Sequence, residues 1–390
     1  MMRDRRVTAS ARDRRPVVAL VTDAIYPFHY GGKENRYDGL LSRLCVHAEL
    51  HVYTMNWWHG ARTRQDETAT FHAVCGLHPM YVNGRRSMRQ AAFFALGCLR
   101  LMVGRFDVIE ADHMPYLQIL ALRLVATVRR KRLVVTWHEF WGKEYWEQYL
   151  GRFGRIAWLM EWLAMRLPDH IIAASVQTAD RLRAATAGRL QVTVAPNGID
   201  LDTIRGALPT GKPVDIVTVG RLISHKRIDM LFEAMAMLDA AGEPVSCRII
   251  GDGPERAVLH EHAERLGLGH AVEFRHDIHE PKELYGQMKS ARVSAFPSAR
   301  EGFGIAVLEA IACGLPVVTT SAPDNLAQHL VASSKRGLIC QPSAESLAAA
   351  LRQALADTST DPRQEQSGDP WLEDFGWDAA SEVVAGVLLA

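Results

Sequence analysis

The sequence lacks the features by which disulfide-rich, zinc-binding and membrane-spanning chains are usually recognised. Its six cysteines are scattered singly along 390 residues, without a CxxC pair or regular spacing. They therefore predict neither a disulfide framework nor a thiolate zinc site. There is no run of about 18 apolar residues, and the basic N-terminus runs into Pro16 without the apolar core of a signal peptide. These absences predict a cytoplasmic protein that does not span a membrane.

The formal net charge of +1 conceals an uneven distribution of charge. Residues 1–198 hold 28 basic and 17 acidic side chains, whereas residues 199–390 hold 17 basic and 27 acidic ones, so the halves carry about +11 and −10. At about 150 residues per domain, the length predicts two or three domains. An apolar content of 48 % is enough to fill their cores.

Short apolar runs alternate with amphipathic segments of helical length along most of the chain. Runs rich in Val and Ile, separated by helices, are typical of parallel sheets with crossover helices. The predicted fold class is therefore α/β, with two Rossmann-like, doubly wound, parallel-sheet domains. The runs form two series, at 17–23, 50–55, 106–112, 133–139, 170–175 and 192–198, and at 214–220, 246–253, 272–277, 292–298, 316–321 and 338–342.

The two series meet near 195–213, where Pro, Gly and Asp interrupt the pattern. We predict a basic tail without ordered structure over 1–15, domains over 16–198 and 199–370, and a C-terminal helix over 371–390. In open α/β sheets, ligands bind beyond the carboxyl ends of the strands. Functional residues are therefore expected just after each strand, in a cleft between the two domains.

The stretch SAREGFGIAVLEA (298–310) places two carboxylates eight positions apart, Glu301 and Glu309. Gly302 and Gly304 leave the start of a helix bare, so its N–H groups can meet an anion such as a diphosphate. In a regular helix, eight residues span about 12 Å, which resembles the span of a nucleotide-sugar from its hexose to its ribose. The alternative is a helix-dipole partner followed by an exposed glutamate. The apolar surroundings of Glu309 count against that alternative, since an unpaired charge there would be costly.

Other candidates follow other strands. Arg221 and Lys226 could hold a diphosphate, although a solvated basic loop is an equally good interpretation. His138 ends the run 133–139, where a catalytic group belongs, but a histidine packed at a strand end is more common. Gly31 and Gly32 follow the first strand, and such pairs also mark plain turns.

Several motifs together resemble the retaining glycosyltransferases of family 4, which have the GT-B fold. They are APNGID, GRLISHKRIDMLFEAMAML, IIGDGPERAVL and VSAFPSAREGFGIAVLEAIACGLPVVTT, in this order over about 195–345. The N-terminal half matches more loosely, through GG, TWHE and DHIIAAS. The resemblance implies two Rossmann-like domains facing across a cleft, with the acceptor bound by 16–198, the nucleotide-sugar bound by 199–370, and the C-terminal helix packed back on the N-terminal domain.

The resemblance also implies roles for individual residues. Arg221 and Lys226 would bind the donor diphosphate, while Glu301 and Glu309 would contact the donor sugar and the ribose. The family's usual histidine is followed by Asp, and here Glu139 follows His138. The implied catalytic residues are His138, Glu301, Arg221 and Lys226, and the implied donor-binding residues are Gly31, Gly32, Arg221, Lys226, Glu301, Gly302, Phe303, Gly304, Ile305 and Glu309.

The predicted function is retaining transfer of a hexose from a UDP- or GDP-sugar to a glycan, lipid-linked or small-molecule acceptor, in cell-envelope polysaccharide or glycolipid synthesis. Arg221, Lys226 and a helix N-terminus would stabilise the leaving diphosphate, so we expect no metal and no cofactor besides the donor. GDGPER (251–256) lacks the third glycine of a dinucleotide fingerprint, which argues against an NAD site. The alternatives are a nucleotide-sugar epimerase of the same fold and a non-catalytic carbohydrate-binding protein.

Three segments of the basic half, 83–107, 122–133 and 141–169, combine Arg and Lys with Phe, Trp, Leu and Met. Such segments can lie on an anionic membrane surface, which would place the protein on the inner face of the membrane. Equally, these helices could bury their apolar sides in the core. No nucleic-acid partner is expected, because the basic residues are dispersed and no recognised motif is present.

Overall fold

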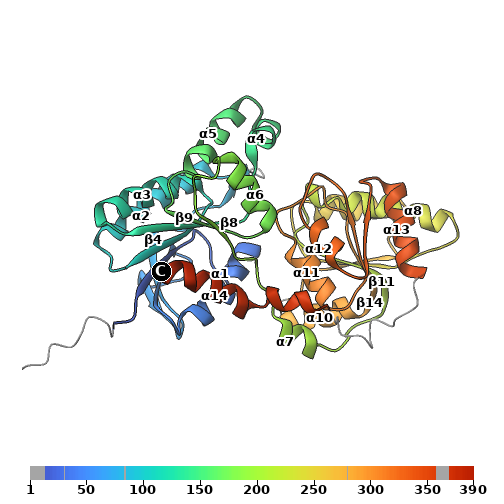
Figure 1. Ribbon diagram of the computed structural model, residues 1–390. Helices are drawn as coiled ribbons and strands as arrows, with labels where there is room; N and C mark the ends of the chain where they lie inside the picture. Colours follow the sequence, from blue (N-terminus) through green and yellow to red (C-terminus); the bar gives the residue numbers. More distant parts are fainter. Residues whose placement is uncertain (1–13, 30, 83–84, 279, 357–368) are drawn as a thin grey trace, which may run out of the picture. The chain divides into compact units, whose positions relative to one another are not determined.

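The computed structural model describes residues 14–29, 31–82, 85–278, 280–356 and 369–390 (Figure 1). Residues 1–13 of the predicted basic tail lie outside this range. The chain forms two compact units. The first unit comprises the chain up to Ala195 together with Ser381–Ala390, and the second unit comprises Pro196–Ala380.

The first unit is built on a sheet in which every strand pair is parallel except β3 with β4. All six predicted runs of this half form strands of the sheet. β4 was missed, because its partly exposed sequence TFHAVC lacks a continuous apolar run. The strand order is β10 (Val192–Val194), β9 (His170–Ala173), β8 (Arg132–Trp137), β7 (Val108–Asp112), β1 (Val17–Val21), β2 (Glu49–Met55), β4 (Thr70–Cys75) and β3 (Thr63–Gln65), with a separate hairpin of β5 (Tyr81–Val82) and β6 (Arg85–Arg86).

Helices cover this sheet, and their starts follow local capping chemistry. Ser87 accepts a hydrogen bond from the Gln90 N–H at 3.2 Å and so caps α2, and Ser175 caps α6 through the Thr178 N–H at 3.0 Å. α3 packs against both α2 and α5. The helices are α1 (Gly32–Leu44), α2 (Met88–Cys98), η1 (Leu99–Val103), α3 (Tyr116–Arg129), α4 (Gly142–Leu150), η2 (Gly151–Phe153), α5 (Gly154–Ala164) and α6 (Val176–Ala185).

The second unit has a fully parallel six-stranded sheet whose strands are the six runs predicted for this half. In sequence order the strands are arranged 3-2-1-4-5-6, which is the doubly wound order. The α/β prediction of two doubly wound domains is therefore confirmed. The order is β13 (Val272–Arg275), β12 (Cys247–Ile250), β11 (Val214–Val219), β14 (Ala291–Phe296), β16 (Val317–Thr320) and β18 (Gly337–Cys340), with a separate pair of β15 (Arg300–Glu301) and β17 (Asp324–Asn325).

Two cores lie on opposite faces of this second sheet. Val217 and Val317 pack into one core, and their neighbours Ile216 and Val318 pack into the other, as the alternation of side chains along a strand requires. The helices of this unit are α7 (Leu201–Gly206), η3 (Ser224–Lys226), α8 (Ile228–Ala240), α9 (Arg256–Arg265), α10 (Pro281–Lys289), α11 (Ile305–Ala312), α12 (Gln328–Ser333), α13 (Ala344–Ala356) and η4 (Pro370–Phe375).

The C-terminal helix α14 (Trp377–Leu389) belongs to both units. Trp377 packs against Gly198 in the second unit, where a Cβ on Gly198 would lie 2.4 Å from the indole. Val384 and Leu388 are buried, and the Arg132 guanidinium of the first unit donates to the Val387 carbonyl at 3.3 Å. The predicted return of this helix to the N-terminal domain is therefore confirmed. Among the described residues, none of the helices has the length and apolar character needed to cross a bilayer.

Candidate active site

In the second unit, the loop after β11 meets the loop after β14. The Lys226 Nζ lies 2.5 Å from the Glu301 Oε1, and the Ser298 hydroxyl donates to the same oxygen at 2.8 Å. The Ala299 N–H donates to the His225 carbonyl at 2.8 Å, which joins the two loops through their backbones. Lys226 and Glu301, predicted separately from distant parts of the sequence, thus form one pair.

Glu301 is held by its backbone as well as by its side chain. It lies in β15, and its carbonyl accepts a hydrogen bond from the Leu326 N–H at 3.0 Å. The fully buried Asn325 of β17 donates to the Thr319 hydroxyl at 2.9 Å and to the Thr320 carbonyl at 2.8 Å. These contacts tie the loop that carries Glu301 to the end of β16, so the carboxylate is placed by the sheet.

A small hollow opens where β11 and β14 end, which is where this kind of sheet binds ligands. The exposed Arg221 and the partly buried Lys226 both border it. Its lining residues are Thr218, Val219, Gly220, Arg221, Leu222, Lys226, Ile228, Ile249, Phe296, Pro297 and Ser298.

Two glycines of GDGPER allow β12 to approach this hollow closely. A Cβ on Gly251 would lie 2.0 Å from the Gly220 carbonyl oxygen, and a Cβ on Gly253 would lie 2.3 Å from that of Leu222. Real side chains do not tolerate such distances. These glycines therefore serve the packing of one strand-end loop on another.

The entrance of α11 requires glycine at position 304. Gly304 has φ of 94°, and a Cβ there would lie 2.5 Å from the Ala327 Cβ. No side chain caps the helix at this residue. Phe303 is buried, with its ring centroid 5.9 Å from that of Phe375, so its side chain anchors the turn. Backbone N–H groups at this helix start are available for an anion.

Glu309 lies in the second turn of α11 and is partly buried. The Tyr285 hydroxyl donates to its Oε1 at 2.9 Å. Burial raises the pKa of Glu309 to about 7, against the opposing effect of this hydrogen bond. Glu301 lies ahead of this helix, in β15, so a regular helical spacing applies only to the part of the stretch within α11. α11 begins only at Ile305, because the backbone at Gly304 is left-handed.

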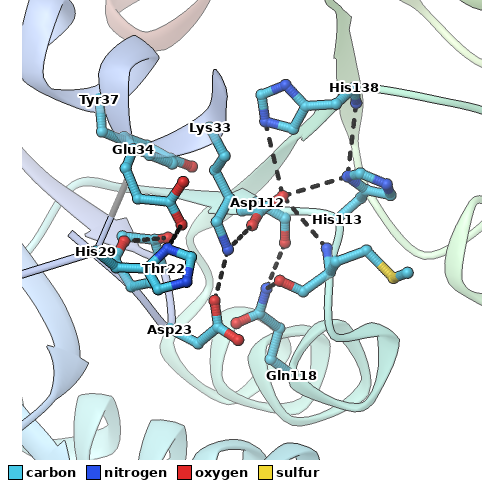
Figure 2. Close-up of polar contacts among 12 residues, drawn as sticks. Thr22, Asp23, His29, Lys33, Glu34, Tyr37, Asp112, His113, Gln118 and His138 are labelled. Carbon is cyan, nitrogen blue, oxygen red and sulfur yellow. Dashed lines mark hydrogen bonds and ion pairs between the residues drawn. The ribbon is translucent and has the colours of Figure 1, made fainter. Parts of the chain in front are cut away.

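The first unit holds a second group of predicted residues at the carboxyl ends of its strands (Figure 2). Gly31 and Gly32 lie at the start of α1, and Lys33 follows in its first turn. The Lys33 Nζ lies 2.5 Å from the Asp23 Oδ1, just after β1, and 2.7 Å from the Asp112 Oδ2, at the end of β7. Both carboxylates are fully buried. This pairing offsets the cost of burying them.

His138 lies just after β8, beside the same carboxylate (Figure 2). Its Nε2 is 3.7 Å from the Asp112 Oδ1, and the His113 Nδ1 is 3.2 Å from that oxygen. Burial lowers the pKa of His138 to about 3, although Asp112 opposes the shift, so the ring is neutral at physiological pH. Glu139 accepts a hydrogen bond from the Trp141 indole at 3.0 Å. The carboxylate beside His138 therefore comes from another strand, not from the following residue.

Asp112, His113 and His138 present one oxygen and two nitrogens within 4.8 Å of one another, as a metal site would require. However, the Lys33 ammonium already lies against Asp112. A divalent cation would have to bind beside this fixed positive charge, so the group fits a metal poorly and we derive no step from one.

Models of two protein families cover most of the chain. Residues 30–203 match "Glycosyltransferase Family 4", and residues 201–369 match "Glycosyl transferases group 1". The chain belongs to the family 4 glycosyltransferases. The resemblance seen in its motifs is thereby confirmed.

Curated relatives of this glycosyltransferase match over part of their length. Glycogen synthase of Mycobacterium tuberculosis is 28 % identical over 59 % of this chain and 56 % of the relative. A GDP-mannose-dependent alpha-(1-6)-phosphatidylinositol dimannoside mannosyltransferase of the same species is 32 % identical over 42 % of this chain and 44 % of the relative. The chain thus spans about half the length of the curated relatives it matches.

Solved structures agree over almost the whole chain. Sucrose-phosphate synthase of Thermosynechococcus elongatus superposes with a TM-score of 0.77 at 19 % identity, covering 96 % of this chain and 98 % of the other. Anabaena HepE, solved in complex with UDP and glucose, gives 0.70 at 18 % identity, covering 96 % and 99 %. The glycosyltransferase therefore has the GT-B fold.

The structure brings Arg221, Lys226, Glu301 and the entrance of α11 together in the second unit, and it places Gly31, Gly32 and His138 in the first. It also adds residues that the sequence analysis missed. Asp112 could have been found, since it is a carboxylate at the end of a predicted buried strand. Ser298, Tyr285 and Asn325 carry no comparable signal. The added residues are Asp23, Lys33, Asp112, His113, Tyr285, Ser298 and Asn325.

Proposed function

We propose that this chain is a retaining hexosyltransferase that uses a UDP- or GDP-sugar as donor. The observation that carries the proposal is the Lys226–Glu301 pair, in which Lys226 borders a hollow at the carboxyl ends of β11 and β14 and Glu301 precedes the bare start of α11. Cations, N–H groups and a carboxylate are the groups that a nucleotide-sugar needs. The names of relatives support the same class of donor, since one is GDP-mannose-dependent and a structural neighbour was solved with UDP.

In this proposal, the donor replaces contacts that the protein now makes with itself. Arg221 and Lys226 bind the diphosphate, and Lys226 leaves Glu301 free to accept hydrogen bonds from hexose hydroxyls. The N–H groups of Gly302 to Ile305 contact sugar and phosphate. Glu309, ionised, accepts from the ribose hydroxyls. Three residues of the first unit also contact the donor in this proposal. They are Gly31, Gly32 and His138, the last as a neutral hydrogen-bonding group.

The chemical step is proposed to proceed with retention by front-face attack. The acceptor oxygen forms a bond to the anomeric carbon while the bond to the diphosphate oxygen breaks. The acceptor proton passes to the leaving phosphate. Arg221, Lys226 and the α11 N-terminus stabilise the charge that develops on the diphosphate. With these groups in place, we propose that no metal is required.

The acceptor is proposed to be a glycan, a small molecule or a lipid-linked sugar of cell-envelope polysaccharide or glycolipid synthesis. The phosphatidylinositol dimannoside in the name of one relative supports the lipid-linked class. The enzyme would then act in the cytoplasm, on the inner face of the membrane.

Thermal unfolding with UDP-, GDP-, ADP- and dTDP-sugars tests the proposal. A true donor present at about 100 times its Kd stabilises the folded protein by roughly 2.7 kcal/mol. We expect one nucleotide to raise the Tm, with and without EDTA. If none of the donors raises the Tm, the donor-site assignment is wrong. A rise that EDTA abolishes would contradict metal independence.

A further inference from the structure

Three helices of the first unit leave much of their apolar surface uncovered. α2, α3 and α5 lie side by side on the face of the sheet opposite α1 and α14 (Figure 1), and their buried residues share one core with β1, β7 and β8. α2 and α3 contact strands of the sheet, and α5 contacts α3 and α4, so the exposed sides of all three helices point away from the core that they share. We call this outer surface the α2–α3–α5 face.

The α5 part of this face is a continuous apolar stripe. Phe153, the last residue of η2, and Ile156, Leu159 and Leu163 of α5 recur at helical spacing, and they are 55 %, 62 %, 54 % and 36 % exposed. Soluble proteins usually turn such a stripe inward. An uncovered apolar stripe marks an interaction surface.

The neighbouring helices extend the apolar surface. In α2, Phe93 and Leu96 are 42 % and 64 % exposed, and in α3, Leu124 and Val128 are 52 % and 61 % exposed. These pairs also recur at helical spacing. Three adjacent helices thus present large apolar side chains away from the core, which extends the stripe into a broad surface.

The exposed charges that the helices of this face supply are all positive. α2, η1, α3 and α5 contain five arginines and one acidic residue, Glu161. Glu161 is fully buried and accepts hydrogen bonds from the Tyr116 hydroxyl and the Trp146 indole. These elements therefore expose no carboxylate. Acidic side chains nearby come from other segments, where Asp169 pairs with Arg123 and Glu147 pairs with Arg155. The arginines in these elements are Arg89, Arg100, Arg123, Arg129 and Arg155.

Arginines also lie over aromatic rings around this face. The guanidinium of Arg89 is 5.7 Å from the centroid of Phe93, and that of Arg152 is 4.9 Å from that of Phe153. At the end of α5, Arg166 lies 4.0 Å from the Trp162 ring. A cation beside a ring suits the boundary between lipid headgroups and acyl chains, where apolar and charged surfaces are solvated together.

We propose that the α2–α3–α5 face docks on an anionic lipid bilayer. A bilayer matches both features of the face at once, because its uniform negative charge complements arginines and its acyl region takes up apolar side chains over a broad area. The docking rests on the proposed function, because the enzyme would reach a lipid-linked acceptor through this face. Binding to vesicles itself needs neither donor nor acceptor.

Co-sedimentation of the full chain with vesicles tests the docking. We expect binding to vesicles of equal parts phosphatidylglycerol and phosphatidylcholine, weak binding to phosphatidylcholine alone, and release in about 1 M NaCl, where charges are screened beyond about 3 Å. The double substitution Ile156→Asp with Leu159→Asp should lower the binding at least tenfold. Arg155→Gln should lower it about fivefold, the equivalent of about 1 kcal/mol for one cation.

A matched control lies in the second unit. Leu208 and Val258 are 76 % and 56 % exposed, and Leu208→Asp with Val258→Asp makes the same change of charge and apolarity away from the face. This variant should bind vesicles as the unsubstituted chain does. The proposal is wrong if the two double variants lose vesicle binding equally or if the unsubstituted chain does not bind vesicles. It is also wrong if the chain forms a dimer that only the Ile156/Leu159 variant abolishes. Glu301→Ala should still bind vesicles, which separates this test from that of the donor site.

Discussion

Lys226 and Glu301 form a short ion pair whose two side chains are 20 % and 11 % exposed. In the proposed reaction, each of them changes partner when the donor arrives. Lys226 turns to the diphosphate and Glu301 to the hexose. The two side chains should therefore contribute to different parts of donor binding.

Glu301→Ala should abolish sugar transfer while the nucleotide diphosphate without sugar still binds. Removing the carboxylate takes away the hexose contact and leaves Lys226 free for phosphate. Calorimetry with the nucleotide and a transfer assay with the sugar donor measure the two separately. Ser298→Ala, which removes one hydrogen bond to the same carboxylate, should lower transfer only modestly. Equal loss of nucleotide binding and transfer in Glu301→Ala would contradict the assignment.

The binding of nucleotide-sugar should strengthen as the pH rises through the pKa of Glu309. Burial raises this pKa to about 7, and only the ionised carboxylate accepts from both ribose hydroxyls. Affinity should therefore rise about tenfold between pH 6 and pH 8. Tyr285→Phe removes the hydrogen bond that lowers the pKa, so the midpoint should move to higher pH. Glu309→Gln should bind weakly at every pH. A pH-independent affinity of the unsubstituted protein would exclude the ribose contact.

Asp112 is the residue on which the polar cluster of the first unit depends. Asp112→Asn leaves the buried Lys33 with one carboxylate fewer, and breaking such a pair costs about 3–5 kcal/mol. Burial raises the pKa of Asp112, but the Lys33 ammonium and the hydrogen bond with His113 outweigh it, so its folded-state pKa lies below the ordinary value. The stabilisation by the ionised Asp112 carboxylate is thus present above about pH 4. It is lost as the pH falls further, through the folded-state pKa.

Urea unfolding at several pH values checks this expectation for Asp112. At pH 7 the free energy of unfolding of Asp112→Asn should be much lower than that of the unsubstituted protein. This difference should shrink below about pH 4. Asp180→Asn serves as control, because Asp180 and Arg183 form an exposed pair worth at most about 1 kcal/mol. A difference of equal size at every pH would show that the charge of Asp112 does not matter.

At the scale of elements, the start of α11 determines the conformation of the loop between Glu301 and this helix. Gly304→Ala should lower the free energy of unfolding for two reasons. An alanine at positive φ costs about 1–2 kcal/mol, and the close contact of its Cβ with Ala327 costs about 1–3 kcal/mol more. Gly267→Ala isolates the first effect, since Gly267 has φ of 76° and open space around its Cβ position. Chemical denaturation compares the two variants. Similar losses would mean that the Ala327 contact relaxes freely.

The sequence predicts the strands well because buried parallel strands carry long runs of Val and Ile, as in VVALV of β1. It fails at β4, where a partly exposed strand near the edge of the sheet has no such run. The position of Lys226 and Glu301 shortly after predicted strands is confirmed. Their direct contact was not predictable, since it depends on how two loops 75 residues apart in sequence pack. The partnership of His138 with Asp112 likewise depends on strands being neighbours in the sheet.

At the scale of the whole molecule, the last ten residues complete the first unit. Leu388 is 4 % exposed, and replacing it with alanine should lower the free energy of unfolding by about 2–5 kcal/mol. Val383, on the same helix but 38 % exposed, should cost at most about 0.5 kcal/mol. Thermal unfolding of both single variants checks the difference. Equal small losses would mean that α14 is dispensable for the first unit.

The chain leaves the first unit after Ala195 and re-enters it at Ser381. The second unit is therefore an insertion that two chain connections, or joints, link to the first unit. A single backbone cut within it would leave both pieces still joined to parts of the first unit. If the proposed function is right, exchanging Pro196–Ala380 as one segment should exchange donor specificity. The second joint lies inside α14, so a graft must preserve helical phase there. One residue added or removed would turn Leu388 by about 100° away from its packing partners.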